Sequence, residues 1–238
     1  MAEVLTKFTI RHAEVQLESF VEAPSGPGPF PAVLLFPGAT GPGESFRATA
    51  RELAAGGHLV FGIDMYGVDA DLSTAEAAGG YFQDLLSAPQ VLRDRVVAWF
   101  EAVRDHPGVD SSRVSAIGYC FGGKCVLELA RSGADLRSVT SFHGLLKTHE
   151  PARPGGVKAH VAIWSGGRDP YAPIEDYDEV RREFDAAGAE YQATLFAWAA
   201  HSFTDPDHDG FAPGIEYDGL AHRISWSATV ALLEHCSQ

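Results

Sequence analysis

Residues 118–123 read Gly-Tyr-Cys-Phe-Gly-Gly, which has the form glycine, any residue, nucleophile, any residue, glycine. The apolar run 114–117 in front of it predicts a short buried strand, and residues 124–131 behind it predict a helix. Strand, sharp turn and helix together indicate a nucleophile elbow, in which flanking glycines let neighbouring backbone approach closely. Cys120 stands at the nucleophile position, where a helix N-terminus favours the thiolate. A glycine-rich turn with a small buried cysteine is the alternative that this stretch alone leaves open.

The length and composition fit one sizeable α/β domain, and no break in composition along the chain indicates a second. We therefore expect residues 1–238 to form a single domain. Lysine and arginine total 18 against 32 aspartates and glutamates, which gives a net charge of -14. Repulsion then argues against nucleic acid and anionic membrane as partners. An anionic small substrate would need a local basic pocket.

The N-terminus and the hydropathy indicate neither export nor a membrane span. A basic segment followed by an apolar one is missing at the start, and no apolar run approaches the roughly 18 residues of a spanning helix. The cysteines Cys120, Cys125 and Cys236 form an odd and sparse set, typical of a reducing compartment and not of a disulfide framework. We therefore expect a cytoplasmic protein, while the sequence leaves the oligomeric state open.

Hydrophobic periodicity predicts strands that alternate with helices along most of the chain. The predicted strands are an antiparallel edge pair in 8–21, then 32–36, 58–63, 114–117, 138–142, 159–164 and 191–197. The predicted helices are 44–55, 90–104, 124–131, 174–187 and 224–236, and segment 68–87 is expected to be a surface excursion with short helices near a pocket mouth. This order is typical of an α/β fold with a mostly parallel, doubly wound sheet, helices on both faces, and functional residues at the carboxyl ends of its strands.

A cysteine nucleophile needs a base and an acid that orients the base, each on a loop after a strand. Asp169 follows the strand 159–164 in a tight glycine-containing loop, and His201 follows the last predicted strand. Taken singly, Asp169 could be a turn former and His201 an ordinary surface histidine. The order Cys120, Asp169, His201, with steps of 49 and 32 residues, is however the order of nucleophile, acid and base in the α/β-hydrolase fold. We expect these residues to form a catalytic triad.

Elbow geometry also predicts where a developing oxyanion would bind. The backbone N–H of Phe121 is the first expected donor, and the second should come from the loop after strand 32–36, with Ala39 or Gly38 as candidates. Three other residues that follow predicted strands could line the substrate pocket, with core or rim packing as the alternative: Tyr66, His143 and Trp198.

The residues resemble the dienelactone hydrolase family in four places. These are the elbow at 118–123, the acid loop at 166–169 with Pro173, the histidine loop at 201–203 and the strand end at 63–67, so the resemblance extends over roughly residues 30–235. It implies an α/β-hydrolase fold and a Cys-His-Asp triad that hydrolyses lactones or esters through an acyl-enzyme thioester, without a metal or a cofactor.

Two departures from the family pattern bear on the substrate. The resemblance implies a glutamate after the first core strand that interacts with the resting cysteine, and Gly38 stands there in this chain. It also implies an arginine four residues after the catalytic histidine that binds a substrate carboxylate, and Asp205 stands there instead. We therefore expect the reaction type of the family with a small neutral ester or lactone as the substrate partner.

Two other functions stay open at this point. Cys125 lies five residues after Cys120 and could resolve an oxidised Cys120, which would make the protein a thiol redox sensor. An α/β-hydrolase fold also serves noncatalytic binding proteins, since a fold does not determine a function.

Residues 205–216 match the spacing of a calcium-binding loop, with acids at Asp205, Asp207 and Asp209, glycine at the sixth place and Glu216 at the twelfth. The surroundings do not fit, because a strand and His201 precede the loop where an EF-hand has a helix. We expect an acidic surface loop and no metal site, with calcium as the alternative.

Overall fold

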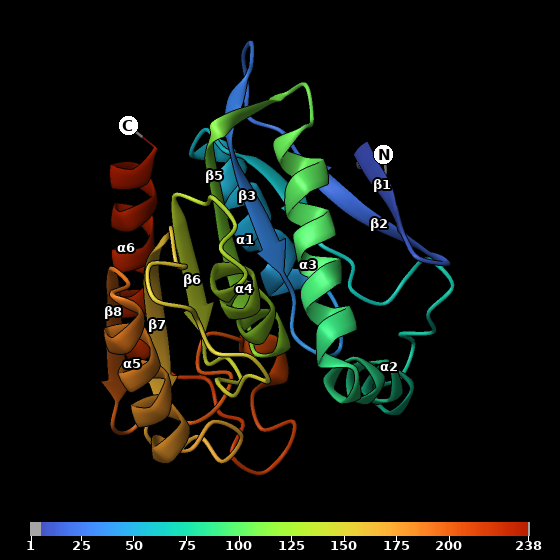
Figure 1. The fold of residues 1–238 in the computed structure, drawn as a ribbon. Coiled ribbons are helices and arrows are strands. Elements are labelled where there is room, and N and C mark those ends of the chain that lie inside the picture. The colour runs from blue at the N-terminus through green and yellow to red at the C-terminus, as the bar shows by residue number, and fades with distance from the viewer. Residues whose placement is uncertain (1–5, 238) are drawn as a thin grey trace.

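The computed structural model describes residues 6–237, and within this range the chain forms one eight-stranded sheet and six α-helices (Figure 1). The strands are β1 Thr6–His12, β2 Val15–Glu22, β3 Phe30–Phe36, β4 Leu59–Gly62, β5 Val109–Tyr119, β6 Ser138–Phe142, β7 His160–Gly166 and β8 Tyr191–Phe196. The helices are α1 Glu44–Ala55, α2 Ala75–Ser87, α3 Pro89–Arg104, α4 Phe121–Arg131, α5 Ile174–Ala187 and α6 Gly219–Cys236, with a 3-10 helix η1 at Pro206–His208.

The strands lie in the order β1-β2-β4-β3-β5-β6-β7-β8. All pairs from β4 to β8 are parallel, whereas β1 and β2 form an antiparallel pair that extends the sheet beyond β4. The carboxyl ends of the parallel strands therefore meet at one edge of the sheet. The predicted α/β class and the antiparallel pair at the sheet edge are both confirmed.

The core has two layers because the central strands are covered on both faces. On β3, Leu34 belongs to a buried cluster that includes residues of α3, α4 and α5, while the neighbouring Leu35 belongs to a second cluster that includes residues of α1 and α6. Both leucines are completely buried, and each such burial stabilises the fold by roughly 1.5–3 kcal/mol. None of the helices in residues 6–237 is both long and apolar enough to cross a membrane.

Several element boundaries differ from the sequence prediction, most of all at the starts of α6 and β5. Helix α6 begins at Gly219, because the side chain of Asp218 caps it by accepting the N–H groups of Leu220 and Ala221. Strand β5 begins at Val109, which pairs with Phe30 of β3, and the polar residues 110–113 lie in a register shift before Val114 pairs with Ala32. The segment predicted as a surface excursion contains the 13-residue helix α2, whose periodic signal is weakened by two central glycines.

Candidate active site

The elbow joins β5 to α4, and Cys120 lies at its tip with a positive φ of 53°. A side chain at Gly118 would overlap the carbonyl oxygen of Gly122, and one at Gly122 would overlap the carbonyl oxygen of Phe36. The glycines are therefore required by the close approach of β3, β5 and α4. This packing holds a non-glycine residue in a backbone conformation that is uncommon for such residues.

His201 and Asp169 form a buried pair at the same edge of the sheet. The Nδ1 atom of His201 lies 2.7 Å from Oδ2 of Asp169, and the two residues are 3% and 5% exposed. The other carboxylate oxygen, Oδ1, accepts the N–H groups of Tyr171 at 2.8 Å and Ala172 at 3.1 Å. Asp169 is thus fixed by its own loop, and it orients the His201 ring so that Nε2 is left for the nucleophile.

The thiol of Cys120 is hydrogen bonded to His201. Burial raises the pKa of the Cys120 thiol, but the His201 charge and its hydrogen bond lower it, and the net pKa lies below the ordinary value. Burial lowers the pKa of His201, while the Cys120 charge and the bonds to Asp169 and Cys120 raise it to about 10. Both shifts favour a thiolate beside an imidazolium.

Two backbone N–H groups also lower the pKa of the Cys120 thiol, those of Phe121 and Ala39. Both were predicted as oxyanion donors, one from the elbow and one from the loop after β3. Gly38, the other candidate, lies beside Cys120. A Cβ added at Gly38 would lie 3.7 Å from Cβ of Cys120. Two donors converging from separate loops form the arrangement that stabilises charge on a reacting oxygen.

A cavity of about 230 Å³ opens beside Cys120 and His201. Its apolar wall is formed by Phe82, Leu145, Phe211, Ala212 and Ile215. Asp205 also lines this cavity, so its carboxylate opposes a negatively charged group in it. The size and the walls suit a small acyl compound without a carboxylate.

Of the three predicted pocket residues, the structure brings His143 into this cavity. Its ring packs 5.3 Å from that of His201, and its Nε2 lies 2.8 Å from Oγ1 of Thr204. Burial and the charge of His201 lower the pKa of His143 well below its ordinary value, so this second histidine is neutral.

Tyr66 and Trp198 lie elsewhere. Tyr66 lines a neighbouring cavity on the far side of the Ala39 loop, stacks on Phe121 at 5.8 Å, and donates its hydroxyl to the Ala39 carbonyl at 2.9 Å. Its contact is therefore with the backbone that carries the expected oxyanion donors. Trp198 is 46% exposed, and its Nε1 donates to Asp218 at the start of α6. The prediction that Trp198 lines the pocket is not supported, because the indole is turned to the surface.

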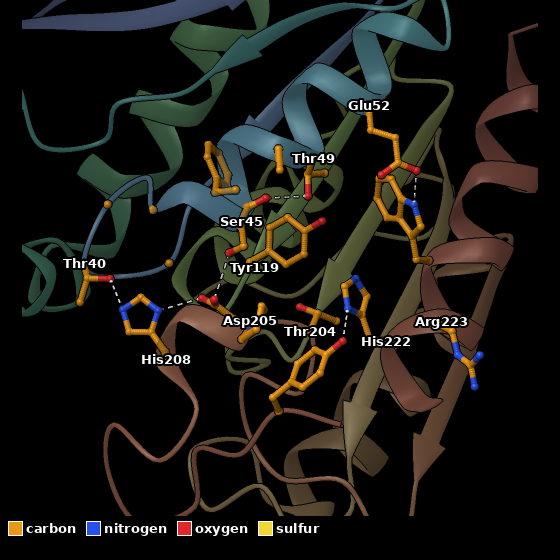
Figure 2. A pocket seen from close by; sticks show the side chains of 18 residues that line it. Thr40, Ser45, Thr49, Glu52, Tyr119, Thr204, Asp205, His208, His222 and Arg223 are labelled. Carbon is orange, nitrogen blue, oxygen red and sulfur yellow. Dashed lines mark hydrogen bonds and ion pairs between the residues drawn. The ribbon is translucent and has the colours of Figure 1, made fainter. Parts of the chain in front are cut away.

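Sequence reasoning did not single out Thr40 and His208, which both line the catalytic cavity. His208 lies in η1 and bridges Thr40 and Asp205 (Figure 2). Thr40, Asp205 and His208 also line a second, larger cavity of about 380 Å³ next to α1 and α6 (Figure 2). Thr40 and His208 are 168 positions apart in the sequence, so no local motif could have indicated their contact.

The acids of the loop 205–216 do not converge on one point. Asp207 accepts the N–H of Ser45, Asp209 accepts the N–H of Tyr217, and Glu216 lies 3.7 Å from Arg168. Within residues 6–237, no three His, Cys, Asp or Glu side chains are grouped so that they could hold a metal ion. The calcium alternative therefore has no support in the geometry.

Cys125 is completely buried within α4, and burial raises the pKa of its thiol. A resolving thiol reacts as an accessible thiolate, and Cys125 is neither accessible nor readily ionised. Cys125 is therefore unsuited to form a disulfide with an oxidised Cys120.

A mostly parallel sheet with a nucleophile elbow and a buried histidine–carboxylate pair at its carboxyl edge defines an α/β-hydrolase. The dienelactone hydrolase family model matches residues 17–237. The chain belongs to the dienelactone hydrolase family and is a hydrolase.

Solved structures and a sequence relative agree with this assignment. The structure of a dienelactone hydrolase-like promiscuous phosphotriesterase from metagenomic libraries is 32% identical, with a TM-score of 0.88 over 98% of this chain and 99% of that chain. A structure described as m3DLH is 30% identical, with a TM-score of 0.87 over 99% and 100%. A Bradyrhizobium sp protein named "Probable 2-oxo-3-(5-oxofuran-2-ylidene)propanoate lactonase" is 25% identical over 226 residues, 90% of this chain and 88% of that protein.

Proposed function

We propose that this protein hydrolyses small neutral esters or lactones through an acyl thioester on Cys120, with His201 as acid and base and Asp169 as the group that orients His201. The observation that carries the proposal is that Cys120 at the tip of the elbow, His201 with Asp169 behind it, and the Ala39 loop all line one cavity. A nucleophile held between a proton donor and two oxyanion donors has what acyl transfer needs.

In the first half of the reaction, the Cys120 thiolate attacks the acyl carbon and a carbon–sulfur bond forms. The carbonyl electrons move to oxygen, and the N–H groups of Phe121 and Ala39 bind the resulting oxyanion. When the oxyanion collapses, the carbon–oxygen bond to the alcohol breaks and the His201 imidazolium gives its proton to the leaving oxygen. The products are the free alcohol, or the opened ring of a lactone, and the thioester.

In the second half, His201 acts as a base because its surroundings have changed. The thioester carries no charge, so the attraction and hydrogen bond to the thiolate that raised the His201 pKa are gone, while burial still lowers it. The neutral ring takes a proton from water as the water oxygen attacks the thioester. Release of the carboxylic acid returns the thiolate and the imidazolium.

The substrate class follows from the pocket. The Asp205 carboxylate lines the cavity, and the apolar wall offers no cation to a carboxylate substituent. The two alternatives have less support, since Cys125 is buried away from redox exchange and the relatives are described as hydrolytic enzymes.

The test is hydrolysis of p-nitrophenyl esters of short carboxylic acids, with intact-protein mass spectrometry during turnover. Wild type should release p-nitrophenol and carry one acyl group on Cys120. Cys120→Ala should lose both signals, whereas the matched variant Cys125→Ala should retain them. Turnover that persists in Cys120→Ala would refute the proposal.

A further inference from the structure

The loop after β3 carries one of the proposed oxyanion donors but has little stiffness of its own. Between Gly38 and Ser45 it contains three glycines, and Gly41 has a φ of +84°. An oxyanion donor is effective only when its position is fixed before the reaction. Contacts from outside the loop must therefore hold Ala39 in place.

One such contact comes from His208, whose ring spans the space between two loops (Figure 2). Its Nδ1 lies 2.8 Å from Oδ2 of Asp205, and its Nε2 lies 3.1 Å from Oγ1 of Thr40. Because an ionised carboxylate only accepts, Asp205 fixes the ring with a proton on Nδ1. A neutral His208 then presents Nε2 as an acceptor for the Thr40 hydroxyl.

A second pair of contacts holds the far end of the loop. The Ser45 hydroxyl donates to Oδ1 of Asp205 at 3.1 Å, and the Ser45 N–H donates to Oδ2 of Asp207 at 2.8 Å. Ser45 lies in the first turn of α1, which has no side-chain cap of its own. The carboxylate of Asp207 thus satisfies a free N–H of that helix from across the site.

We propose that Asp205 and His208 are positioning residues that hold Ala39 for oxyanion binding by anchoring Thr40 and Ser45 on either side of the glycine segment. We call Asp205, Asp207 and His208 the latch. This inference rests on the proposed function, because it assigns the latch a role in acyl transfer. Tyr66 holds the same loop from the opposite side through its bond to the Ala39 carbonyl.

The latch also gives a reason for an acid at position 205. An arginine there carries only donors and could accept neither from Nδ1 of His208 nor from Ser45, so the latch needs an acceptor at this position, which the Asp205 carboxylate supplies. Thr40, Asp205 and His208 line both the cavity beside Cys120 and the larger cavity, so they form part of the wall between them. Position 205 therefore serves the oxyanion loop in this chain.

The test separates the oxyanion loop from the nucleophile. Thr40→Val removes the hydroxyl with almost no change of shape, His208→Ala removes the bridge, and Thr40→Ser restores the hydroxyl. Each variant is assayed for p-nitrophenyl ester turnover and for alkylation of Cys120 by iodoacetamide. Alkylation needs the thiolate but forms no oxyanion. It reports mainly on Cys120 and His201, because the Ala39 N–H contributes less than His201 to the lowered pKa of Cys120. His222→Ala is the matched control, because His222 lines the larger cavity and not the one beside Cys120.

We expect kcat to fall on the order of 10-fold in Thr40→Val and His208→Ala, because displaced donors stabilise the transition state less well. KM should change less than about twofold, the alkylation rate should fall much less than kcat, and Thr40→Ser should recover most of the turnover. Wild-type turnover in both Thr40→Val and His208→Ala would overturn the inference, and so would alkylation that falls in step with turnover.

The isosteric Thr40→Val keeps the test valid if His208→Ala does not fold. Failure of the proposed function gives a different result, since Cys120→Ala would then turn over ester as wild type does. Failure of the latch alone leaves turnover dependent on Cys120.

Discussion

Replacing Gly123 by alanine tests whether the close packing of α4 against the loop after β6 positions the backbone N–H of Phe121. A Cβ at Gly123 would lie 2.6 Å from Cα of Gly144, which is backbone and cannot swing aside. Ordinary contact begins at 3.4 Å, so α4 and the loop after β6 have to separate by about 0.8 Å. Overpacking of this kind costs roughly 1–3 kcal/mol of the free energy of unfolding. A shift approaching 1 Å at a catalytic group lowers turnover by about 10-fold to 100-fold.

The assay is urea unfolding together with kcat/KM for a short p-nitrophenyl ester. Gly80→Ala is the matched control, because it adds the same methyl group in α2 where nothing lies within 4 Å. That change should stabilise the protein by up to about 1 kcal/mol through helix propensity. If Gly123→Ala unfolds at the wild-type urea concentration, the packing argument is wrong. If it is destabilised but turns over ester normally, the displacement does not reach the Phe121 N–H.

Two further predictions concern the charge on the nucleophile and the second brace of the loop. The pH midpoint of Cys120 alkylation by iodoacetamide should lie below the ordinary thiol pKa of about 8.5. His201→Ala should move this midpoint above that value, because burial then acts without the opposing imidazolium. An unmoved midpoint would contradict the ion pair. Tyr66→Phe removes the hydrogen bond to the Ala39 carbonyl and should lower kcat roughly fivefold, the equivalent of about 1 kcal/mol. The control Tyr191→Phe on β8 should leave kcat unchanged. Equal kcat values for the two variants would show that the Tyr66 hydroxyl is not needed to hold Ala39.

The sequence predicted the parts of the site that are encoded locally. The elbow has a short pattern because three chain segments cannot approach unless Gly118 and Gly122 lack side chains. Asp169 and His201 could be proposed because a parallel sheet brings the ends of its strands to one edge, whatever the number of residues between them. Helix α1 was predicted with the boundaries it has, 44–55, since a glycine pair follows it directly.

Features that depend on contacts between distant loops could not be predicted in this way. The direction in which Tyr66 points is decided by Ala39 and Phe121, and the exposure of Trp198 by Asp218. The proposed role of Asp205 could be inferred only from the position of His208 in the structure. The sequence alone shows an acid in place of the family's arginine but not the histidine that it contacts. Hydrophobic periodicity indicates which face of an element is buried and carries no information about such side-chain pairs.

The absence of a side chain at Gly38 and the low pKa of Cys120 belong together. The resemblance to dienelactone hydrolases implies a glutamate at this position that interacts with the resting cysteine. Any side chain here would begin 3.7 Å from Cβ of Cys120. A carboxylate so close would raise the thiol pKa by repulsion and would compete for His201. With glycine at position 38, the contacts that act on the sulfur are those of His201 and the Phe121 and Ala39 N–H groups, which all favour the thiolate. In the proposed mechanism these contacts favour an ionised nucleophile before substrate arrives, so selectivity has to come from the shape and charge of the pocket.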